Sequence, residues 1–286
     1  MMAVSLSVKR DFLLGCLHTV LITLLTIIAV TLFLQHQQTL QVVRVSVPIP
    51  NLSPAWEGTR LGLIADLHIR SRSDVVRVTR VVHQLNDQKP DLIVIAGDTV
   101  DAEVGDAASA TPAIEALSAL HAPLGVYLVF GNHDEPRARL WRPLLENAGI
   151  RVLENKHVRL LKENDSLYLV GLASASFGRL NASMAWKGIP TQATIIATVH
   201  EPDAADRLSG RPLALQLSGH SHGGQVRLPF REPRHLPPLG RKYPSGLQQT
   251  DAGHLVYTTR GIGTSHIPLR LFARPEITMI TLQRGQ

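Results

Sequence analysis

The chain has 286 residues, of which 44% are hydrophobic and 18% are charged. This balance suits one large α/β domain with a buried core, and it excludes both a wholly disordered chain and a membrane protein of many spans. The formal net charge of +6 favours anionic partners such as phosphates or phospholipid surfaces. The single cysteine, Cys16, excludes an intrachain disulfide and a cysteine-based zinc cluster.

The N-terminal segment is predicted to cross a membrane once. Residues 12–34 carry no charge and are long enough to span the roughly 30 Å hydrocarbon core of a bilayer as a helix. A cleaved signal peptide is the alternative, because Lys9 and Arg10 precede the run. The length of the run and the lack of a small-residue cleavage site after it favour an uncleaved anchor. The two basic residues also predict a cytoplasmic N-terminus, with the rest of the chain on the outer side.

Four segments are expected along the chain. Residues 1–11 form a basic N-terminus and residues 12–34 the transmembrane helix. Residues 35–56 form a connector and a first strand, because β-branched residues are followed by prolines there. Residues 57–286 form the globular domain.

Short apolar strands then alternate with helical patterns. Helices are predicted at residues 75–85 and 114–120. Strands are predicted at residues 61–65, 92–96 and 126–130, and each ends directly in a cluster of polar residues. Because ligand sites in α/β sheets gather at the carboxyl ends of strands, these clusters are expected to converge. Further strands are predicted at residues 167–173, 194–199, 213–217, 225–228 and 255–258.

Five clusters carry the residues suited to chemistry. Taken singly, an Asp or a His at a strand end is usually a turn or cap residue, and the paired histidines in a glycine-rich turn are the strongest single sign. Together the clusters supply imidazoles, carboxylates and one amide oxygen, which suit a borderline divalent ion such as Mn²⁺, Fe²⁺, Zn²⁺ or Co²⁺. In chain order they are Asp66-x-His68, Gly97-Asp98-x-x-Asp101, Gly131-Asn132-His133-Asp134, His200 and Gly219-His220-x-His222.

This ordered set resembles the motifs of the calcineurin-like metallophosphoesterase superfamily, DxH, GDxxD, GNH(D/E), H and GHxH. The segments at residues 200–203, 219–226 and 259–278 are similar to a membrane-anchored bacterial branch, which includes phosphodiesterases of the UDP-2,3-diacylglucosamine pyrophosphatase type. The resemblance implies an α/β fold, a four-layer αββα sandwich of two mixed sheets with the metals at one sheet edge. It also implies a place in the bacterial inner membrane, and the basic N-terminus then puts the catalytic domain on the periplasmic side.

The resemblance further implies two divalent metal ions, with Mn²⁺ preferred, and a role for each motif residue. His133 would stabilise or protonate the leaving oxygen, and Asp101 would hold the His133 ring in orientation. Asp134 is open between a turn residue and a functional one. The ligands implied are Asp66, His68, Asp98 and His222 for one ion, and Asp98, Asn132, His200 and His220 for the other, with Asp98 as the bridge.

A basic, proline-rich loop covers residues 227–242. A charged, solvated loop is its plainest interpretation. The alternative is that Arg227, Arg231 and Arg234 bind an anionic lipid headgroup or the non-reacting phosphate of a diphosphate.

The preferred function is therefore metal-dependent hydrolysis of a phosphate ester or anhydride, on a phosphorylated and lipidic substrate at the membrane. Within the resembling branch one substrate is UDP-2,3-diacylglucosamine, cleaved in lipid A synthesis, although an outward-facing domain conflicts with a cytosolic UDP-sugar. The alternatives are a general phosphodiesterase or phosphatase acting on nucleotides or phospholipid headgroups, and a tethered binding module without catalysis. The last is disfavoured because every ligand position is filled. No nucleic-acid-binding module is recognisable, so no nucleic-acid partner is expected.

Overall fold

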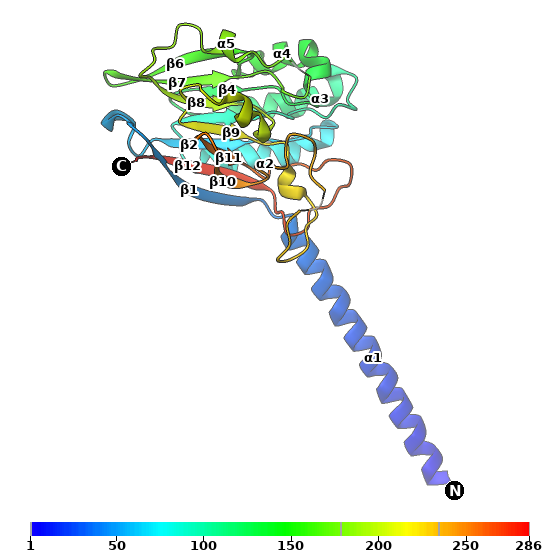
Figure 1. The fold of residues 1–286 in the computed structure, drawn as a ribbon. Coiled ribbons are helices and arrows are strands. Elements are labelled where there is room, and N and C mark those ends of the chain that lie inside the picture. The colour runs from blue at the N-terminus through cyan, green and yellow to red at the C-terminus, as the bar shows by residue number, and fades with distance from the viewer. Residues whose placement is uncertain (1, 178, 234, 286) are drawn as a thin grey trace. The chain divides into compact units, whose positions relative to one another are not determined.

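A computed structural model describes residues 2–177, 179–233 and 235–285 of the chain (Figure 1). The chain divides into two compact units, Met1–Thr39 and Leu40–Gln286. Each unit is described by itself.

The first unit is one long helix, α1 (Met2–Gln37). Its segment Leu14–Gln37 is 24 residues long, has a mean hydropathy of 2.4 and is long and apolar enough to cross a membrane. The hydroxyls of Thr19, Thr23 and Thr26 each donate to a carbonyl four residues earlier. Polar groups satisfied within the helix suit an apolar surrounding. This helix therefore fits a single-pass membrane protein.

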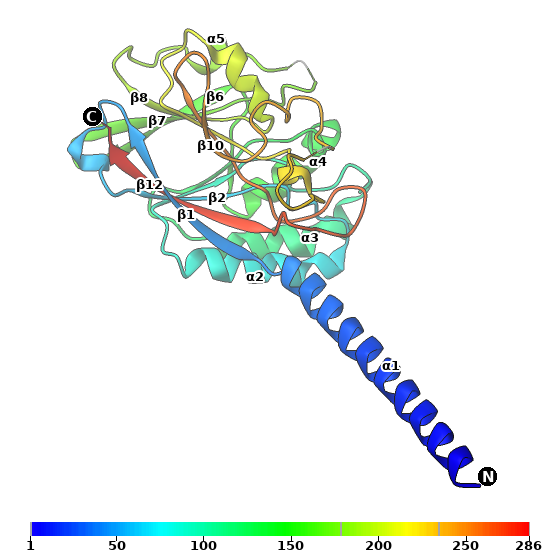
Figure 2. The same ribbon diagram turned by 60° about the horizontal axis from the view of Figure 1, so that its bottom comes forward.

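The first sheet of the second unit has the strand order β1-β12-β2-β3-β4-β5. β12 runs parallel to β1 but antiparallel to β2, and the strands from β2 to β5 are parallel to one another. β1 and β12 lie side by side (Figure 2), and their starts are thus at the same edge of the sheet as the ends of β2, β3 and β4. The bounds are β1 Gln41–Ile49, β2 Arg60–Ile64, β3 Leu92–Ile95, β4 Val126–Leu128, β5 Arg151–Val152 and β12 Glu276–Arg284.

The second sheet has the order β10-β11-β9-β8-β7-β6. Its four inner strands are parallel, and the edge strands β10 and β6 are antiparallel to their neighbours. The two sheets share an apolar core to which Leu63 and Val94 contribute from the first sheet and Ile196 and Leu217 from the second. The bounds are β6 Lys156–Lys162, β7 Asp165–Gly171, β8 Thr194–Thr198, β9 Leu215–Ser218, β10 Gly246–Gln249 and β11 Leu255–Thr258.

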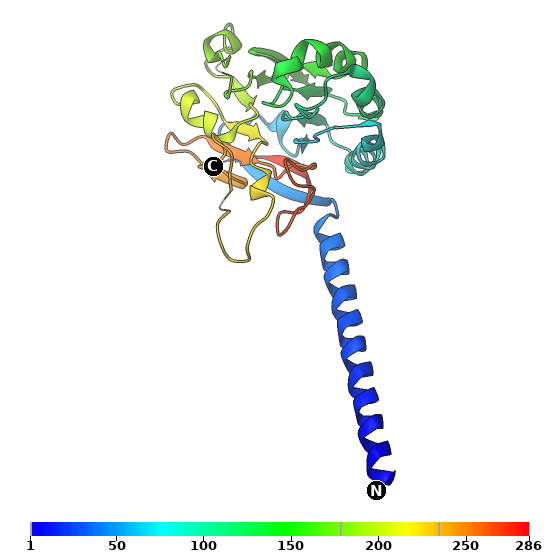
Figure 3. The ribbon, with the colours of Figure 1, turned by 90° about the vertical axis from the view of Figure 1, so that its right-hand side faces the viewer.

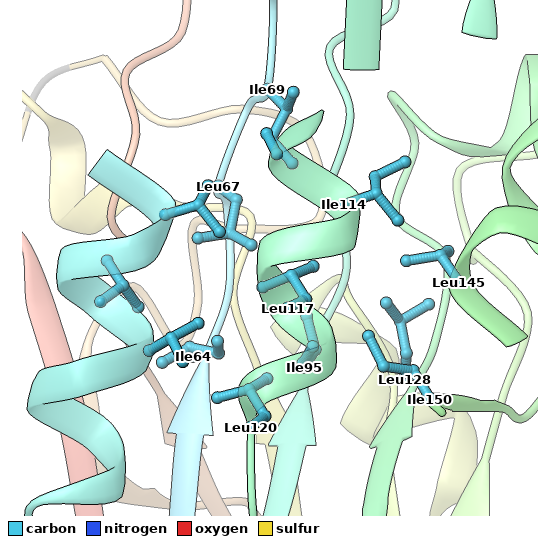
Figure 4. Close-up of a cluster of buried hydrophobic side chains, with 14 of the residues drawn as sticks. Ile64, Leu67, Ile69, Ile95, Ile114, Leu117, Leu120, Leu128, Leu145 and Ile150 are labelled. Atoms are coloured by element: carbon cyan, nitrogen blue, oxygen red, sulfur yellow. The ribbon is translucent and has the colours of Figure 1, made fainter. Parts of the chain in front are cut away.

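Three helices cover the outer face of the first sheet: α2 (Val75–Asn86), α3 (Ala107–Ala116) and α4 (Ala138–Asn147). Figure 4 shows this layer, with Ile64 of β2 and Leu145 of α4 among its labelled core residues. In α2 the buried side chains recur at helical spacing, which explains why this segment folds as an amphipathic helix. The short 3₁₀ segments are Pro54–Trp56, Arg72–Asp74, Leu117–Ala119, Glu135–Arg137, Pro202–Leu208 and His222–Gly224.

The second sheet has a thinner cover. The four-residue helix α5 (Ala182–Ala185) and the 3₁₀ segment Pro202–Leu208 pack on it through Ala185, Ala204 and Leu208. The predicted arrangement of two mixed sheets with helices outside is confirmed.

The predicted elements match the structure unevenly. The strands predicted at residues 61–65, 92–96 and 126–130 are confirmed as β2, β3 and β4, and the helix predicted at 114–120 begins earlier, at Ala107. The strand predicted at residues 225–228 is wrong. Val226 makes only an isolated bridge to Leu271, because Gln225 has a left-handed backbone with φ of 50° that breaks the extended run.

Candidate metal centre

The first set of predicted ligands lies on loops that leave the carboxyl ends of β2, β3 and β4. The N–H of Asp66 donates to the carbonyl of Gly97 at 2.9 Å, and the N–H of His68 donates to the carbonyl of Asp98 at 3.0 Å. These bonds continue the pairing of β2 and β3 beyond the strands, so the two loops stay together. The predicted site residues on these three loops are Asp66, His68, Asp98, Asp101, Asn132 and His133.

The second set comes from the other sheet. His200 follows β8, and His220 and His222 follow β9. The backbone N–H of His220 donates to Asp66 Oδ1 at 3.0 Å, which ties the loop of the second sheet to the first. All seven predicted metal ligands therefore lie on loops that follow the carboxyl ends of β2, β3, β4, β8 and β9, where the two sheets meet.

Asp66, His68 and His222 form one candidate metal group. One donor atom from each lies within 4.8 Å of the others. His68 Nε2 is 3.1 Å from His222 Nε2, and Asp66 Oδ1 is 3.5 Å from His222 Nε2. Two ring nitrogens this close cannot both carry protons, and a cation placed among them satisfies both lone pairs.

Asp98, His200 and His220 form a second group with the same spread of donor atoms. Asp98 Oδ2 lies 3.1 Å from His200 Nε2 and 3.7 Å from His68 Nε2, so one oxygen borders both groups. The other oxygen, Oδ1, accepts the backbone N–H of His133 at 2.8 Å, which fixes the carboxylate. Asp98 is thus placed where a bridging ligand is needed.

Burial and neighbouring charges shift the pKa values of Asp66 and Asp98 in opposite directions. Burial raises the pKa of Asp66, and the neighbouring charge of Asp98 raises it further. Burial also tends to raise the pKa of Asp98, but the charges of the neighbouring histidines, His200 first, outweigh it and hold that pKa well below its usual range. The resulting buried negative charge calls for nearby cations.

Two buried polar atoms of the site lack a hydrogen-bond partner among the described residues: Asn132 Oδ1 and His200 Nε2. Buried polar atoms are almost always paired in folded proteins, so such atoms indicate a missing ligand. An amide oxygen and an imidazole nitrogen are both donors for divalent transition metals. The residues present therefore fit two divalent cations.

Outer contacts fix which nitrogen His200 and His220 present to the site. His200 Nδ1 donates to the carbonyl of Ala96 at 2.6 Å, which leaves Nε2 as the donor to a metal. His220 Nε2 donates to the carbonyl of Pro238 at 2.8 Å, which leaves Nδ1 for the metal. Second-layer bonds of this kind orient metal-binding histidines in general, and here they assign the tautomers.

Asp101 contacts two histidines rather than one. Its Oδ2 lies 3.1 Å from His68 Nδ1 and accepts a hydrogen bond from Arg70 Nε at 3.0 Å. Its Oδ1 lies 3.6 Å from His133 Nδ1. That separation is longer than a hydrogen bond, and His133 Nδ1 instead accepts the backbone N–H of Ala102 at 3.3 Å. The predicted role of Asp101 toward His133 stays a prediction, and the structure adds a closer contact to His68.

Most candidate ligand positions have a strained backbone. Asp66, His68, Asp98, His220 and His222 have φ values of 54°, 45°, 50°, 71° and 52°, in the left-handed region that non-glycine residues rarely adopt. Such strain gathers at functional sites, where the surrounding structure holds it. A sequence pattern does not reveal it.

Asp134 is more than the turn residue that one interpretation of the sequence allowed. Its side chain is fully buried and accepts the backbone N–H groups of Val100 at 2.8 Å, Thr99 at 3.1 Å and Gly131 at 3.0 Å. Burial, with the charge of Asp98 next, raises the pKa of Asp134 to about 7. Through these hydrogen bonds Asp134 connects the loop after β3 with the loop after β4.

Arg270, unlike Asp134, was not singled out from the sequence. It is fully buried, its Nη2 lies 3.1 Å from His222 Nδ1, and its Nε donates to the carbonyl of Gly263 at 2.8 Å. Burial lowers the pKa of Arg270 to about 10. Burial also holds the pKa of His222 well below its usual range, which keeps that ring neutral, as metal binding requires. Arg270 lies in an irregular segment, within residues 259–278 that resemble the bacterial branch but outside the five motifs, so no role of its own was predicted for it.

A cavity of about 670 Å³ opens onto the metal groups. Asp98, Asn132 and His133 are among its polar lining residues, and Val226 and Ile267 are among its apolar ones.

The predicted substrate-binding arginines lie elsewhere. Arg227 and Arg231 line two neighbouring hollows, and Arg241 is the arginine that lines the cavity itself. Arg234 lies outside the described residues.

Comparison with known proteins identifies the class. A family model described as calcineurin-like phosphoesterase matches residues 59–224. The chain is 33% identical over 231 residues to the uncharacterized metallophosphoesterase YkuE of Bacillus subtilis, covering 80% of each protein. It is 33% identical over 224 residues to phosphodiesterase YaeI of Escherichia coli, covering 77% of this chain and 80% of YaeI.

A third relative is a zebrafish (Danio rerio) transmembrane protein with a metallophosphoesterase domain, 33% identical over 283 residues. The match covers 94% of this chain but 63% of the zebrafish protein. The chain belongs to the calcineurin-like phosphoesterase family. It is a metal-dependent phosphoesterase.

Proposed function

We propose that this protein is a membrane-anchored phosphodiesterase that hydrolyses phosphoesters with two divalent cations. One cation would be held by Asp66, His68, Asp98 and His222, and the other by Asp98, Asn132, His200 and His220. Mn²⁺ is the proposed metal, because mixed oxygen and imidazole donors without thiolates suit it. The position of Asp98 Oδ2 supports this function most directly. It lies 3.1 Å from His200 Nε2 and 3.7 Å from His68 Nε2, between the two candidate metal groups.

The cations, when bound, would lower the pKa of a water molecule and offset charge on the phosphoryl oxygens. His133 lines the cavity beside them and is the proposed general acid. Its Nδ1 lies 3.3 Å from the backbone N of Ala102, so Nε2 is the ring nitrogen proposed to give up the proton. Burial lowers the pKa of His133, but the carboxylates of Asp101 and Asp98 more than offset this, so the pKa is raised. A raised pKa keeps a proton available for the leaving oxygen.

The proposed substrate is amphiphilic, with a phosphodiester or diphosphate head. The candidate membrane span supports a lipidic partner, and the apolar residues of the cavity support one with an apolar portion. UDP-2,3-diacylglucosamine is one narrower candidate of this chemistry. Product analysis by mass spectrometry, after incubation with phospholipids, nucleotides and this UDP-sugar, separates the candidates.

The proposed roles can be tested with bis-p-nitrophenyl phosphate. The full chain in detergent micelles with Mn²⁺ should release nitrophenolate. His133→Ala should lower kcat by about 10²–10⁴-fold, as expected for a lost general acid, while the bound metal per chain stays at the wild-type level.

The matched control is His121→Ala, since His121 is exposed and lies outside the cavity. Unchanged kcat in His133→Ala would remove His133 from the mechanism. Loss of metal in that variant would show that it is a ligand instead.

A further inference from the structure

The chain enters the second unit at the sheet edge that carries the metal ligands. β1 begins at Gln41 opposite Glu276 of β12, and β12 runs antiparallel to β2. The start of β1 therefore lies at the same edge as the end of β2, which Asp66 and His68 follow. In the sequence only residues 38–40 separate α1 from β1, a link of about 10 Å when fully extended.

Exposed apolar side chains gather near this edge. Phe230 is fully exposed, and Leu228 and Phe272 are exposed by 55% and 40%. We call these three residues the apolar patch. The N–H of Arg227 donates to the carbonyl of Leu271 at 2.9 Å, which holds the two segments of the patch together.

The patch is close to the start of β1. The N–H of Gln41 donates to the carbonyl of Pro275 at 2.9 Å, three positions beyond Phe272 in the chain. Figure 3 shows the loops after β9 and before β12 at the same end of the second unit as the start of β1. An exposed apolar cluster marks an interaction surface, and its place at this end favours a lipid partner.

Basic residues flank the apolar patch. Arg227 and Arg231 line the same hollow as Leu228, Phe230 and Phe272, together with one acidic residue, Glu232. Apolar tips beside arginines are typical of protein surfaces that enter the headgroup region of an anionic bilayer. The positive charge of Arg227 and Arg231 beside the apolar patch therefore complements an anionic lipid surface.

Adjoining hollows connect the apolar patch with the metal centre. A middle hollow shares Val226 and His235 with the metal cavity, and it shares Arg227, Leu228 and Arg231 with the hollow at the patch. A molecule whose acyl chains stay in the bilayer would thus have a path for its head from the patch to the metals.

We propose that the apolar patch inserts into the surface of an anionic bilayer and places the mouth of the metal cavity at the lipid headgroups. Lipid phosphoesters then reach the metals directly from the membrane. The substrate class rests on the proposed function, whereas insertion of the patch can be measured without any turnover.

Insertion is tested with the full chain in nanodiscs of phosphatidylcholine and phosphatidylglycerol. Phe230→Trp places a reporter in the patch, while the native Trp56, Trp141 and Trp186 are buried. Leu161→Trp is the matched control, because Leu161 is an exposed apolar residue on the edge strand β6. Lipids brominated along the acyl chains should quench Phe230→Trp several-fold more than Leu161→Trp. Equal quenching of the two variants would overturn the proposal.

Substrate delivery is tested with two probes that share one leaving group. These are phosphatidyl-p-nitrophenol embedded in the nanodiscs and bis-p-nitrophenyl phosphate in solution. Phe230→Ser should raise KM for the embedded probe by about tenfold, as expected for one apolar side chain lost from the bilayer. It should leave turnover of the soluble probe unchanged.

An unchanged KM for the embedded probe would refute the delivery role. If the wild type hydrolyses neither probe, the proposed function fails, while the quenching experiment still decides whether the patch enters the membrane.

Discussion

Asp134 offers a direct test of what holds the metal-binding loops together. Its carboxylate accepts three backbone N–H groups, from Thr99 and Val100 after β3 and from Gly131 after β4. Asp134→Asn keeps the size of the side chain but replaces one acceptor oxygen with an NH₂ group. Whichever way the amide turns, at least one buried N–H faces another donor.

The size of the effect follows from these contacts. If the amide oxygen keeps the bonds to Thr99 and Gly131, the N–H of Val100 loses its acceptor. An unsatisfied buried donor costs roughly 1–3 kcal/mol, and at about pH 8.5, above the pKa of Asp134, the remaining bonds also lose the strength that a charged acceptor gives. We expect a loss of about 2–3 kcal/mol in the free energy of unfolding, or about 5–10 °C in Tm for a domain of this size.

The assay is thermal unfolding of the full chain in detergent, followed by the fluorescence of its buried tryptophans. Asp106→Asn is the matched control, because Asp106 is an exposed N-cap of α3 that accepts the N–H of Ser109 at 2.9 Å. Asn and Asp are about equally good N-caps, so this variant should unfold near the wild-type temperature. If Asp134→Asn unfolds at the same temperature as Asp106→Asn, the role assigned to Asp134 is refuted.

Three further outcomes follow from the geometry of the site. Gly131→Ala should lower bound metal, because its Cβ would lie 2.1 Å from Asp98 Oδ1, whereas Gly105→Ala, with open space around it, should bind metal normally. Wild-type metal content in Gly131→Ala would contradict this. Arg270→Gln should weaken metal binding by about 10–100-fold through the lost contact to His222, and an unchanged metal titration would argue against it. Chelation should abolish hydrolysis of bis-p-nitrophenyl phosphate and readded Mn²⁺ should restore it; activity that persists without metal would exclude the two-metal proposal.

The parts of the fold that carry the site were predictable because their signals are local. β2, β3 and β4 are short apolar runs that stop at polar clusters, and β11 has the bounds predicted for it, Leu255–Thr258. The spacing of the motifs then placed the candidate ligands at strand ends. No long-range information was needed for either step.

Other elements depend on contacts between distant residues. β12 was not predicted, because it buries Glu276 and Thr278, and buried polar residues hide a strand from a hydropathy pattern. Glu276 is satisfied by Tyr257, whose hydroxyl donates to it at 3.0 Å, and by Thr278, whose hydroxyl donates at 2.7 Å. Neither bond can be predicted from the sequence around residue 276.

The prediction of a strand at residues 225–228 was wrong for a related reason. The side chain of Gln225 donates to the carbonyls of Ser265 and Ile267, both at 2.9 Å, and accepts the N–H of Ser265 at 2.7 Å. These bonds to a segment distant in sequence hold Gln225 in its left-handed backbone. The apolar character of Val226 and Leu228 gave no hint of that constraint.

The left-handed backbone at five candidate ligand positions relates the fold to the proposed chemistry. Each such residue costs of order 1–3 kcal/mol, which flexible loops would release by relaxing. Here the loops cannot relax, because the N–H groups of Asp66 and His68 are bonded to the loop after β3 and the apolar core between the sheets fixes both strands. The donor atoms of Asp66, His68 and His222 already lie within 4.8 Å of one another. The sheets therefore hold these donor atoms close together, and binding of a cation here would not need to fold the loops.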